Sequence, residues 1–232
     1  MRNCMTTSLS IGILLGLFVA REVRCAVVTR NVTYFDDQTE LRGYLAYDDS
    51  WDESAPAVVI IQDWDGITLY EQQRAEMIVG LGYVAFCADI YEVDSGTDYY
   101  SLYLEYTGNA TKYLRRMNLG IQEAKSFSFV DSTMVAAIGY CFGGTGVINL
   151  ATAGVDLRAV VSFHGGLTRR AEYTEGTAIP AVVSIHSGGS DDSASDIQQL
   201  QDNLTAGNAS WEVTRYGGVL HAFTMQLARL AI

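Results

Sequence analysis

The strongest constraint on the fold lies in residues 135–144, which read Val-Ala-Ala-Ile-Gly-Tyr-Cys-Phe-Gly-Gly. An apolar run typical of a buried strand ends in a glycine-flanked cysteine and continues into a helical pattern. This G-x-C-x-G form is that of a nucleophile elbow, in which a strand turns sharply into a helix. Glycines flank the apex because a Cβ there would collide with the neighbouring strand or helix. The pattern predicts that Cys141 is a candidate nucleophile; the alternative is a small buried cysteine among glycines.

The rest of the chain alternates between strand and helix patterns. An N-terminal hairpin is expected from residues 32–35 and 41–47. Further strands are expected at 57–61, 83–87, 134–138, 159–163, 181–185 and 211–216. Helices are expected at 70–81, 99–106, 111–127, 143–153 and 193–204, with Glu71 away from the apolar side of the first helix. This rhythm indicates an α/β fold with a mostly parallel sheet and helices on both faces. A hydrophobic content of 49% is ample for one such core.

The first 25 residues have the pattern of a secretory signal peptide. Arg2 precedes an apolar stretch at residues 9–20, and Val23 and Cys25 provide small or aliphatic residues before a cleavage site. The apolar stretch has about twelve residues, whereas a membrane span needs roughly twenty, so an uncleaved anchor is the alternative. We expect residues 26–232 to form a single secreted domain.

Glycosylation sequons support export independently. Asn31, Asn109, Asn203 and Asn208 each begin an Asn-x-Ser/Thr sequon. These are four of the seven asparagines in the chain, whereas random placement would give about one. We therefore expect an extracellular glycoprotein.

The charge and the cysteines limit the classes of partner. Cleavage after residue 25 removes three arginines and one glutamate, a net charge of +2, so the net charge falls from −12 to −14. This disfavours binding to nucleic acid or to an anionic membrane surface, and solubility is the simplest role of the acidity. Only Cys87 and Cys141 would remain, which is no disulfide framework. Cys87 lies in an apolar run and is expected in the core, so Cys141 is expected to be free.

A catalytic thiol needs a base, and the base needs an orienting group. His221 lies in a glycine-bearing loop after the last expected strand. Asp191 lies in the loop after strand 181–185, and Asp192 is a competing choice. The order nucleophile, acid, base is that of a strand–elbow–helix hydrolase site, and all three fall at carboxyl ends of strands, where open α/β sheets bind ligands. Each aspartate taken alone is equally well a turn or helix-capping residue.

The two other histidines, His164 and His186, are expected to be structural because neither follows the last strand. No pairing of the three histidines in the sequence has convincing metal-ligand spacing. We expect no metal site.

Several segments together resemble the dienelactone hydrolase family of α/β-hydrolases. They are Gly-Tyr-Cys-Phe-Gly-Gly at 139–144, Ile-His-Ser-Gly-Gly-Ser-Asp at 185–191 and His-Ala-Phe at 221–223, with further matches at 61–66 and 82–91. The resemblance covers roughly residues 32–225. It implies an α/β-hydrolase fold and a Cys-His-Asp triad that hydrolyses an ester or lactone through an acyl-enzyme, without a cofactor. Mapped by motif, Cys141 is the nucleophile, His221 the base and Asp191 the orienting acid.

The resemblance also implies the groups around the thiol. The oxyanion would be held by the backbone N–H of Phe142 and by one near Trp64. Asp63 occupies the position of a family glutamate that contacts the resting thiol and is linked to its activation. Aspartate is one methylene shorter than glutamate.

Two departures from the family concern the substrate. Bacterial dienelactone hydrolases bind the substrate carboxylate with two arginines, and these positions hold Glu92 and Met225 here. Neither side chain can make the bidentate contact that arginine offers. A neutral ester, lactone or acyl group is therefore expected in place of the family's dienelactone, with Arg169 and Arg170 as candidate replacements.

The C-terminus is a third departure. Eleven residues follow His221, whereas family members continue into a full final helix packed on the sheet. We expect this helix to be short or missing, and a shortened helix would expose an apolar patch of the core.

The leading hypothesis is a secreted, monomeric cysteine hydrolase acting on a small-molecule ester or lactone, without stable membrane association. The competing hypothesis is a noncatalytic α/β-hydrolase-like protein that binds a ligand or protein, because the two arginines are absent. A thiol redox protein is disfavoured because the sequence has no Cys-x-x-Cys motif.

Overall fold

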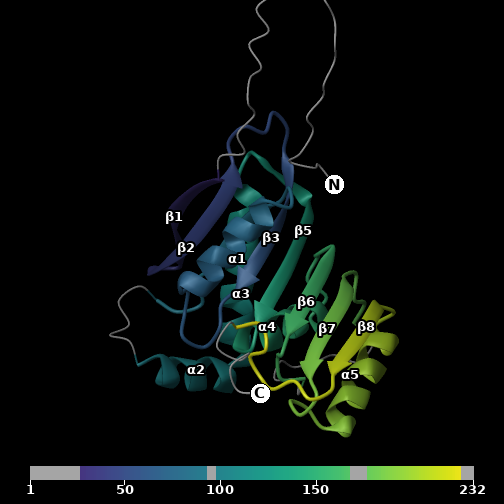
Figure 1. The fold of residues 1–232 in the computed structure, drawn as a ribbon. Coiled ribbons are helices and arrows are strands. Elements are labelled where there is room, and N and C mark those ends of the chain that lie inside the picture. Colours follow the sequence, from purple (N-terminus) through teal and green to yellow (C-terminus); the bar gives the residue numbers. More distant parts are fainter. Residues whose placement is uncertain (1–26, 93–97, 168–176, 226–232) are drawn as a thin grey trace, which may run out of the picture.

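The computed structural model describes residues 27–92, 98–167 and 177–225, and these form one sheet in the order β1-β2-β4-β3-β5-β6-β7-β8 (Figure 1). The strands are β1 (Val27–Asp36), β2 (Thr39–Asp48), β3 (Ala55–Ile61), β4 (Val84–Ala88), β5 (Val130–Tyr140), β6 (Ala159–Phe163), β7 (Val182–Gly188) and β8 (Ser210–Tyr216). The hairpin β1–β2 is antiparallel and joins β4 antiparallel, whereas all pairings from β4 through β3 to β8 are parallel. The predicted α/β class and mostly parallel sheet are confirmed.

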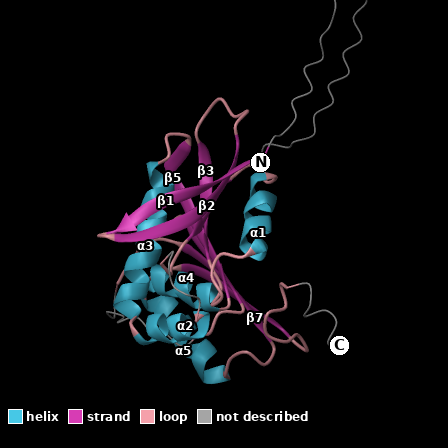
Figure 2. Cartoon of the chain, turned by 90° about the vertical axis from the view of Figure 1, so that its left-hand side faces the viewer, coloured by secondary structure: helices cyan, strands magenta, loops and turns pink. Residues whose placement is uncertain are grey.

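Helices cover the sheet from two sides. They are α1 (Leu69–Val79), α2 (Tyr99–Gly108), α3 (Ala110–Ser126), α4 (Phe142–Thr152) and α5 (Ala194–Ala206). Figure 2 shows α1 on one side of the sheet and α2 to α5 on the other. Helix α4 begins directly at the end of β5, so the strand and helix patterns around residue 141 become one continuous strand–turn–helix unit.

The structure corrects three details of the predicted elements. Strand β5 begins at Val130 and not at residue 134, because the polar, largely exposed residues 131–133 are part of the strand, although they carry no apolar alternation. Helix α1 ends at Val79, where Gly80 caps it, two residues earlier than expected. Glu71, expected away from the apolar side, is fully buried, because it closes a capping box with the N-cap residue Thr68.

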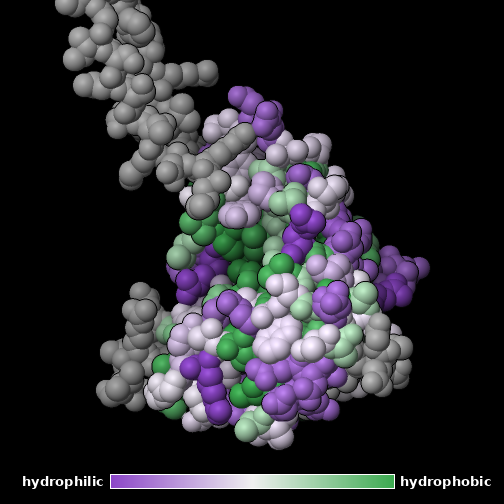
Figure 3. All heavy atoms as spheres, turned by 90° about the vertical axis from the view of Figure 1, so that its right-hand side faces the viewer, coloured by the Kyte–Doolittle hydropathy of each residue, from purple (hydrophilic) through white to green (hydrophobic). Residues whose placement is uncertain are grey.

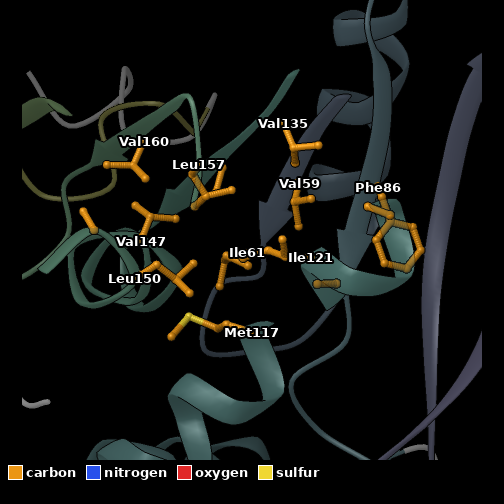
Figure 4. Packing of buried hydrophobic residues seen from close by; sticks show 14 of the residues in the cluster. Val59, Ile61, Phe86, Met117, Ile121, Val135, Val147, Leu150, Leu157 and Val160 are labelled. Atoms are coloured by element: carbon orange, nitrogen blue, oxygen red, sulfur yellow. The ribbon is translucent and has the colours of Figure 1, made fainter. Parts of the chain in front are cut away.

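The main core lies between the sheet and helices α3 and α4. Figure 4 shows Val59, Ile61 and Val135 of the sheet facing Met117 of α3 and Leu150 of α4. All five side chains are buried at 1% exposure or less. Close packing here fixes the carboxyl ends of β3 and β5, from which the loop at residue 63 and the turn at residue 141 emerge.

On the side of α1, no described helix covers β6 to β8 (Figures 1 and 2). Val182 and Tyr216, at 52% and 38% exposure, lie on this part of the sheet. Figure 3, which looks at the molecule from the side of β8, shows hydrophobic side chains gathered on the surface between polar regions. The expected signal peptide at residues 1–25 and the expected short final helix lie outside the described residues, which leave out 1–26 and 226–232.

Candidate active site

Cys141 occupies a strained turn between β5 and α4. Its φ of 49° lies in the left-handed region, which costs a non-glycine residue free energy and is typical of a nucleophile elbow. The flanking glycines are required sterically. A Cβ on Gly139 would lie 2.1 Å from the carbonyl oxygen of Gly143, and a Cβ on Gly143 would lie 2.1 Å from that of Ile61. The thiol is thereby presented at the N-terminus of α4, as the G-x-C-x-G pattern predicts.

The structure brings Cys141, His221 and Asp191 together in the order proposed from the sequence. The Nε2 atom of His221 lies 3.1 Å from the Sγ atom of Cys141. The Nδ1 atom of the same ring lies 3.3 Å from Oδ1 of Asp191. The imidazole can therefore exchange a proton with the thiol while the carboxylate orients it.

The competition between Asp191 and Asp192 is decided by the turn after β7. The backbone N–H of Gly188 donates to Oδ2 of Asp191 at 2.9 Å, which aims the other oxygen at the histidine. Asp192 accepts instead from the backbone N–H of Leu167 and from the hydroxyl of Ser187. Asp192 thus fixes neighbouring loops, and the histidine has Asp191 as its acid partner.

Asp63 lies next to the thiol and to both candidate oxyanion donors. The backbone N–H of Trp64 donates to its Oδ1 at 2.6 Å. Burial is the largest influence on the Asp63 carboxyl and raises its pKa, while hydrogen bonds from the Trp64 N–H, the Cys141 thiol and the Phe142 N–H oppose that rise. In this resting arrangement the carboxylate fills the position that a substrate oxygen would take.

Burial, together with the same carboxylate, keeps the thiol protonated. Burial, and then the charge of Asp63 and its hydrogen bond with the thiol, raise the pKa of Cys141 to about 12. The backbone N–H of Phe142 opposes this rise. A neutral thiol at rest follows from this environment, although the histidine lies within hydrogen-bond reach.

The position of the Phe142 N–H is set by an aromatic cluster. The Phe142 ring is buried and stacks on Tyr113, with 4.3 Å between the ring centroids. The Tyr113 hydroxyl donates to the Phe142 carbonyl at 2.9 Å. Tyr91 also stacks on the Phe142 ring, with 6.1 Å between the centroids, and its hydroxyl donates to the carbonyl of Trp64 at 3.0 Å. These contacts fix the backbone at Trp64 and Phe142, whose N–H groups are the candidate oxyanion donors.

The role of Glu71 was not predicted from the sequence. Its Oε2 accepts from both the backbone N–H and the hydroxyl of Thr68, and its Oε1 lies 3.5 Å from the backbone nitrogen of Asp63. A buried carboxylate in this position ties the loop after β3 to the start of α1. The Thr-x-x-Glu capping pattern at residues 68–71 was the sequence signal that could have revealed it.

The two histidines expected to be structural differ in how close they lie to Cys141 and His221. Both ring nitrogens of His186 are engaged, with Ser184 at 3.1 Å and Tyr216 at 2.9 Å. His164 is fully buried beside the site, and its ring lies 5.1 Å from that of His221. Its Nδ1 accepts from the backbone N–H of Cys141 at 3.1 Å.

Within residues 27–92, 98–167 and 177–225, no group of three or more His, Cys, Asp or Glu side chains is arranged to bind a metal ion. Both cysteines of this part, Cys87 and Cys141, are free. None of the described helices combines the length and apolar character that crossing a membrane requires.

Comparison with known proteins shows the family of this chain. The model of the dienelactone hydrolase family matches residues 41–230, which include the elbow, the acid loop and the histidine loop. The chain belongs to the dienelactone hydrolase family. Membership assigns it to hydrolases that act on ester or lactone bonds.

Individual dienelactone hydrolase relatives are distant. Carboxymethylenebutenolidase 1 of Cupriavidus pinatubonensis is 29% identical over 54% of this chain and 62% of its own length. A putative carboxymethylenebutenolidase of Synechocystis is 25% identical over 85% of this chain and 87% of its own length. A crystal structure of a dienelactone hydrolase-like promiscuous phosphotriesterase from metagenomic libraries is 27% identical, covers 87% of this chain and 86% of its own, and superimposes with a TM-score of 0.78. These comparisons confirm the predicted α/β-hydrolase fold.

Proposed function

We propose that this chain is a secreted hydrolase that cleaves a neutral ester or lactone through an acyl-enzyme on Cys141. One observation carries the proposal: the ring of His221 lies between the thiol, at 3.1 Å, and the Asp191 carboxylate, at 3.3 Å. Family membership provides the reaction class, and this arrangement provides a nucleophile, a base and an orienting acid for it.

The first half-reaction forms the acyl-enzyme. A substrate carbonyl oxygen enters between the N–H groups of Phe142 and Trp64, and the Asp63 carboxylate leaves them. The Cys141 proton passes to Nε2 of His221, and the sulfur attacks the carbonyl carbon, whose π electrons move onto the oxygen. The C–O bond to the leaving group then breaks, and the imidazolium gives its proton to the departing alkoxide.

The second half-reaction releases the acid. Water gives a proton to His221 and attacks the thioester carbon, and the same two N–H groups hold the oxyanion. Collapse breaks the C–S bond, and the thiolate takes the proton back from the imidazolium. Ester and water give acid and alcohol, with the enzyme unchanged; a lactone gives one hydroxy acid.

Asp63 favours a resting enzyme that is activated by its substrate. Its charge raises the pKa of Cys141, so displacing the carboxylate from the thiol and the two N–H groups favours the thiolate. The free enzyme is then a poor nucleophile toward unrelated electrophiles. This is the role that the sequence analysis assigned to the family glutamate, here with the shorter side chain.

The expected substrate lacks a carboxylate near the scissile bond. Glu92 stands in place of one family arginine, and Met225 in place of the other. Met225 closes the turn after the histidine, where its backbone N–H bonds the Ala222 carbonyl at 2.9 Å. Neither side chain attracts an anion. The candidate replacements Arg169 and Arg170 lie outside the described residues.

Hydrolysis of a panel of p-nitrophenyl esters and lactones tests the reaction. The proposal predicts that Cys141→Ala abolishes turnover and that His221→Ala lowers kcat/KM at least about a hundredfold. Turnover that persists in Cys141→Ala would remove the thiol as nucleophile. If the wild type neither turns over an ester nor incorporates a thiol label at Cys141, the ligand-binding hypothesis takes its place.

Secretion and glycosylation form the second part of the proposal. Among the sequon asparagines, Asn31 on β1, Asn109 between α2 and α3, and Asn208 after α5 are exposed, while Asn203 is half-buried in α5. Exposed amides are accessible to a glycan. Expression of the full chain in eukaryotic cells should deliver protein to the medium that loses mass on peptide N-glycosidase treatment. Retention in the cytosol without any mass loss would contradict this part alone.

A further inference from the structure

His164 lies directly after β6, between the elbow and the loop of the catalytic histidine. It is fully buried, and its φ of 42° is in the left-handed region. Its backbone N–H donates to the carbonyl of His186 at 2.7 Å, which fixes the main chain in this conformation. Strained backbone conformations persist only where the surrounding structure enforces them, and they cluster at active sites. The conformation of His164 therefore suggests a role in the active site.

Hydrogen bonding determines the tautomer of this ring. The N–H of Cys141 is shared between the Phe163 carbonyl at 3.0 Å and Nδ1 of His164 at 3.1 Å. A backbone N–H can only donate, so Nδ1 carries no proton. The proton of the neutral ring is on Nε2, which lies 2.8 Å from the hydroxyl oxygen of Thr224 and donates to it.

Thr224 lies three residues after the catalytic histidine and is bound from two further sides. The Tyr70 hydroxyl donates to the Thr224 hydroxyl at 2.7 Å, and the Arg74 guanidinium donates to the Thr224 carbonyl at 2.8 Å. Both residues belong to α1. Much of the loop is exposed, with the side chain of His221 at 50% and Leu220 at 57%. Its other anchors are the Val219 carbonyl, which accepts from the Gly189 N–H at 3.1 Å, and the Phe223 ring, which packs on His164. Thr224 is the residue of the loop that is hydrogen-bonded both to α1 and to His164.

The buried ring stays neutral in this position. Burial, and then the neighbouring His221, lower the pKa of His164 to about 4. The ring is uncharged when the proposed reaction runs near neutral pH, so Nδ1 remains an acceptor. It also places no second cation beside the imidazolium that forms on His221.

We propose that His164 and Thr224 are positioning residues of the active site: the ring joins the main chain of the nucleophile to the loop that carries the base. Through this link the elbow, α1 and the histidine loop are held together, which keeps His221 at proton-transfer distance from Cys141. The inference rests on the proposed cysteine hydrolase function.

The test uses Thr224→Val, which keeps the shape of the side chain but removes its hydroxyl. Thr224→Ser restores the hydroxyl, and Thr107→Val, which removes a hydroxyl bonded only within α2, is the matched control. We expect Thr224→Val to lower kcat about tenfold or more with little change in KM, since a small misplacement of a base is costly. Thr224→Ser and the control should stay near the wild type. A folded Thr224→Val enzyme with wild-type kcat would overturn the proposal.

A second readout separates this inference from the hydrolase function. The rate of Cys141 alkylation by iodoacetamide is measured against pH in the wild type, Thr224→Val, His164→Gln and His221→Ala. We expect both positioning variants to lose the part of the reactivity that His221→Ala loses. If the wild type cleaves no ester, the hydrolase function fails while alkylation still reports positioning. Equal alkylation in the wild type and Thr224→Val, or in the wild type and His221→Ala, would overturn the positioning proposal.

Discussion

Replacement of Asp63 by asparagine should make the Cys141 thiol more reactive. The thiol has a pKa of about 12, raised from 9.0 by burial and then by the charge and hydrogen bond of Asp63. At pH 9 such a group is ionised in roughly one molecule in a thousand. Asparagine keeps the size of the side chain and removes its charge, so burial and the more distant charge of Asp191 are left to raise the pKa of Cys141.

The expected rate change follows from two opposing effects. Loss of the Asp63 charge lowers the pKa of Cys141 and so raises the thiolate fraction, about tenfold for each unit by which that pKa falls. The intrinsic nucleophilicity of a thiolate falls with its pKa, by about half of that on a logarithmic scale. Alkylation at fixed pH should therefore accelerate about threefold for each unit by which the pKa falls, and the midpoint of the pH profile should move to lower pH.

The assay follows iodoacetamide labelling by peptide mass spectrometry, which separates Cys141 from Cys87. Cys87 is fully buried and its pKa is raised well above the usual value, so it serves as an internal unreactive thiol. Asp65→Asn is the matched control, because it removes a nearby carboxylate that does not hydrogen-bond the thiol. An Asp63→Asn protein that is alkylated no faster than the wild type would refute the reasoning.

Three further outcomes are expected. Asp191→Asn should lower kcat on an ester by about a hundredfold or more because it removes the orienting acid, whereas Asp192→Asn should retain most of the activity; equal losses would contradict the assignment. Gly143→Ala should lower the free energy of unfolding, measured in urea, by about 3 kcal/mol, because its Cβ would lie 2.1 Å from the carbonyl oxygen of Ile61 in β3. Gly108→Ala is the control and should change the free energy of unfolding little, because the space around its Cβ is open. The pKa of His164, lowered to about 4, means that below pH 6.5 the unfolded chain binds a proton that the folded chain does not. Stability should therefore fall as pH drops from about 6.5 to about 4, by up to about 3 kcal/mol relative to His164→Gln, and parallel pH profiles of the two proteins would contradict this.

The elbow could be predicted from the sequence because its requirement is local. Gly139 and Gly143 are close in the chain to the residue whose turn they permit, and their Cβ positions are blocked by backbone atoms. The loops of the acid and the base could be placed because parallel strands bring their carboxyl ends to one edge of the sheet. Strand and helix order followed from the alternation of apolar patterns.

Other features depend on contacts between distant segments. The choice of Asp191 over Asp192 depends on which carboxylate accepts the hydrogen bond that the Gly188 N–H donates, and that is a property of one turn. The link from His164 to Thr224 joins residues that are 60 positions apart. A single sequence shows the polar residue but not its partner, so the ring was interpreted only as structural.

The contact of Asp63 with the oxyanion donors could not be predicted from the sequence either. The resemblance placed an acid near the thiol, but whether the shorter side chain meets the Trp64 and Phe142 N–H groups depends on how closely the β3 and β5 loops approach. Packing behind these loops sets that approach, and burial of Glu71 contributes to it.

The central claim is that Cys141 carries the acyl group. Wild-type protein is mixed with p-nitrophenyl acetate, quenched in acid within the first turnover, and digested for peptide mass spectrometry. We predict an added acetyl group on the peptide that contains Cys141, its loss on longer incubation, and its absence in Cys141→Ala together with loss of turnover. Steady hydrolysis by a folded Cys141→Ala protein, or an acetyl group found stably on another residue, would contradict the account.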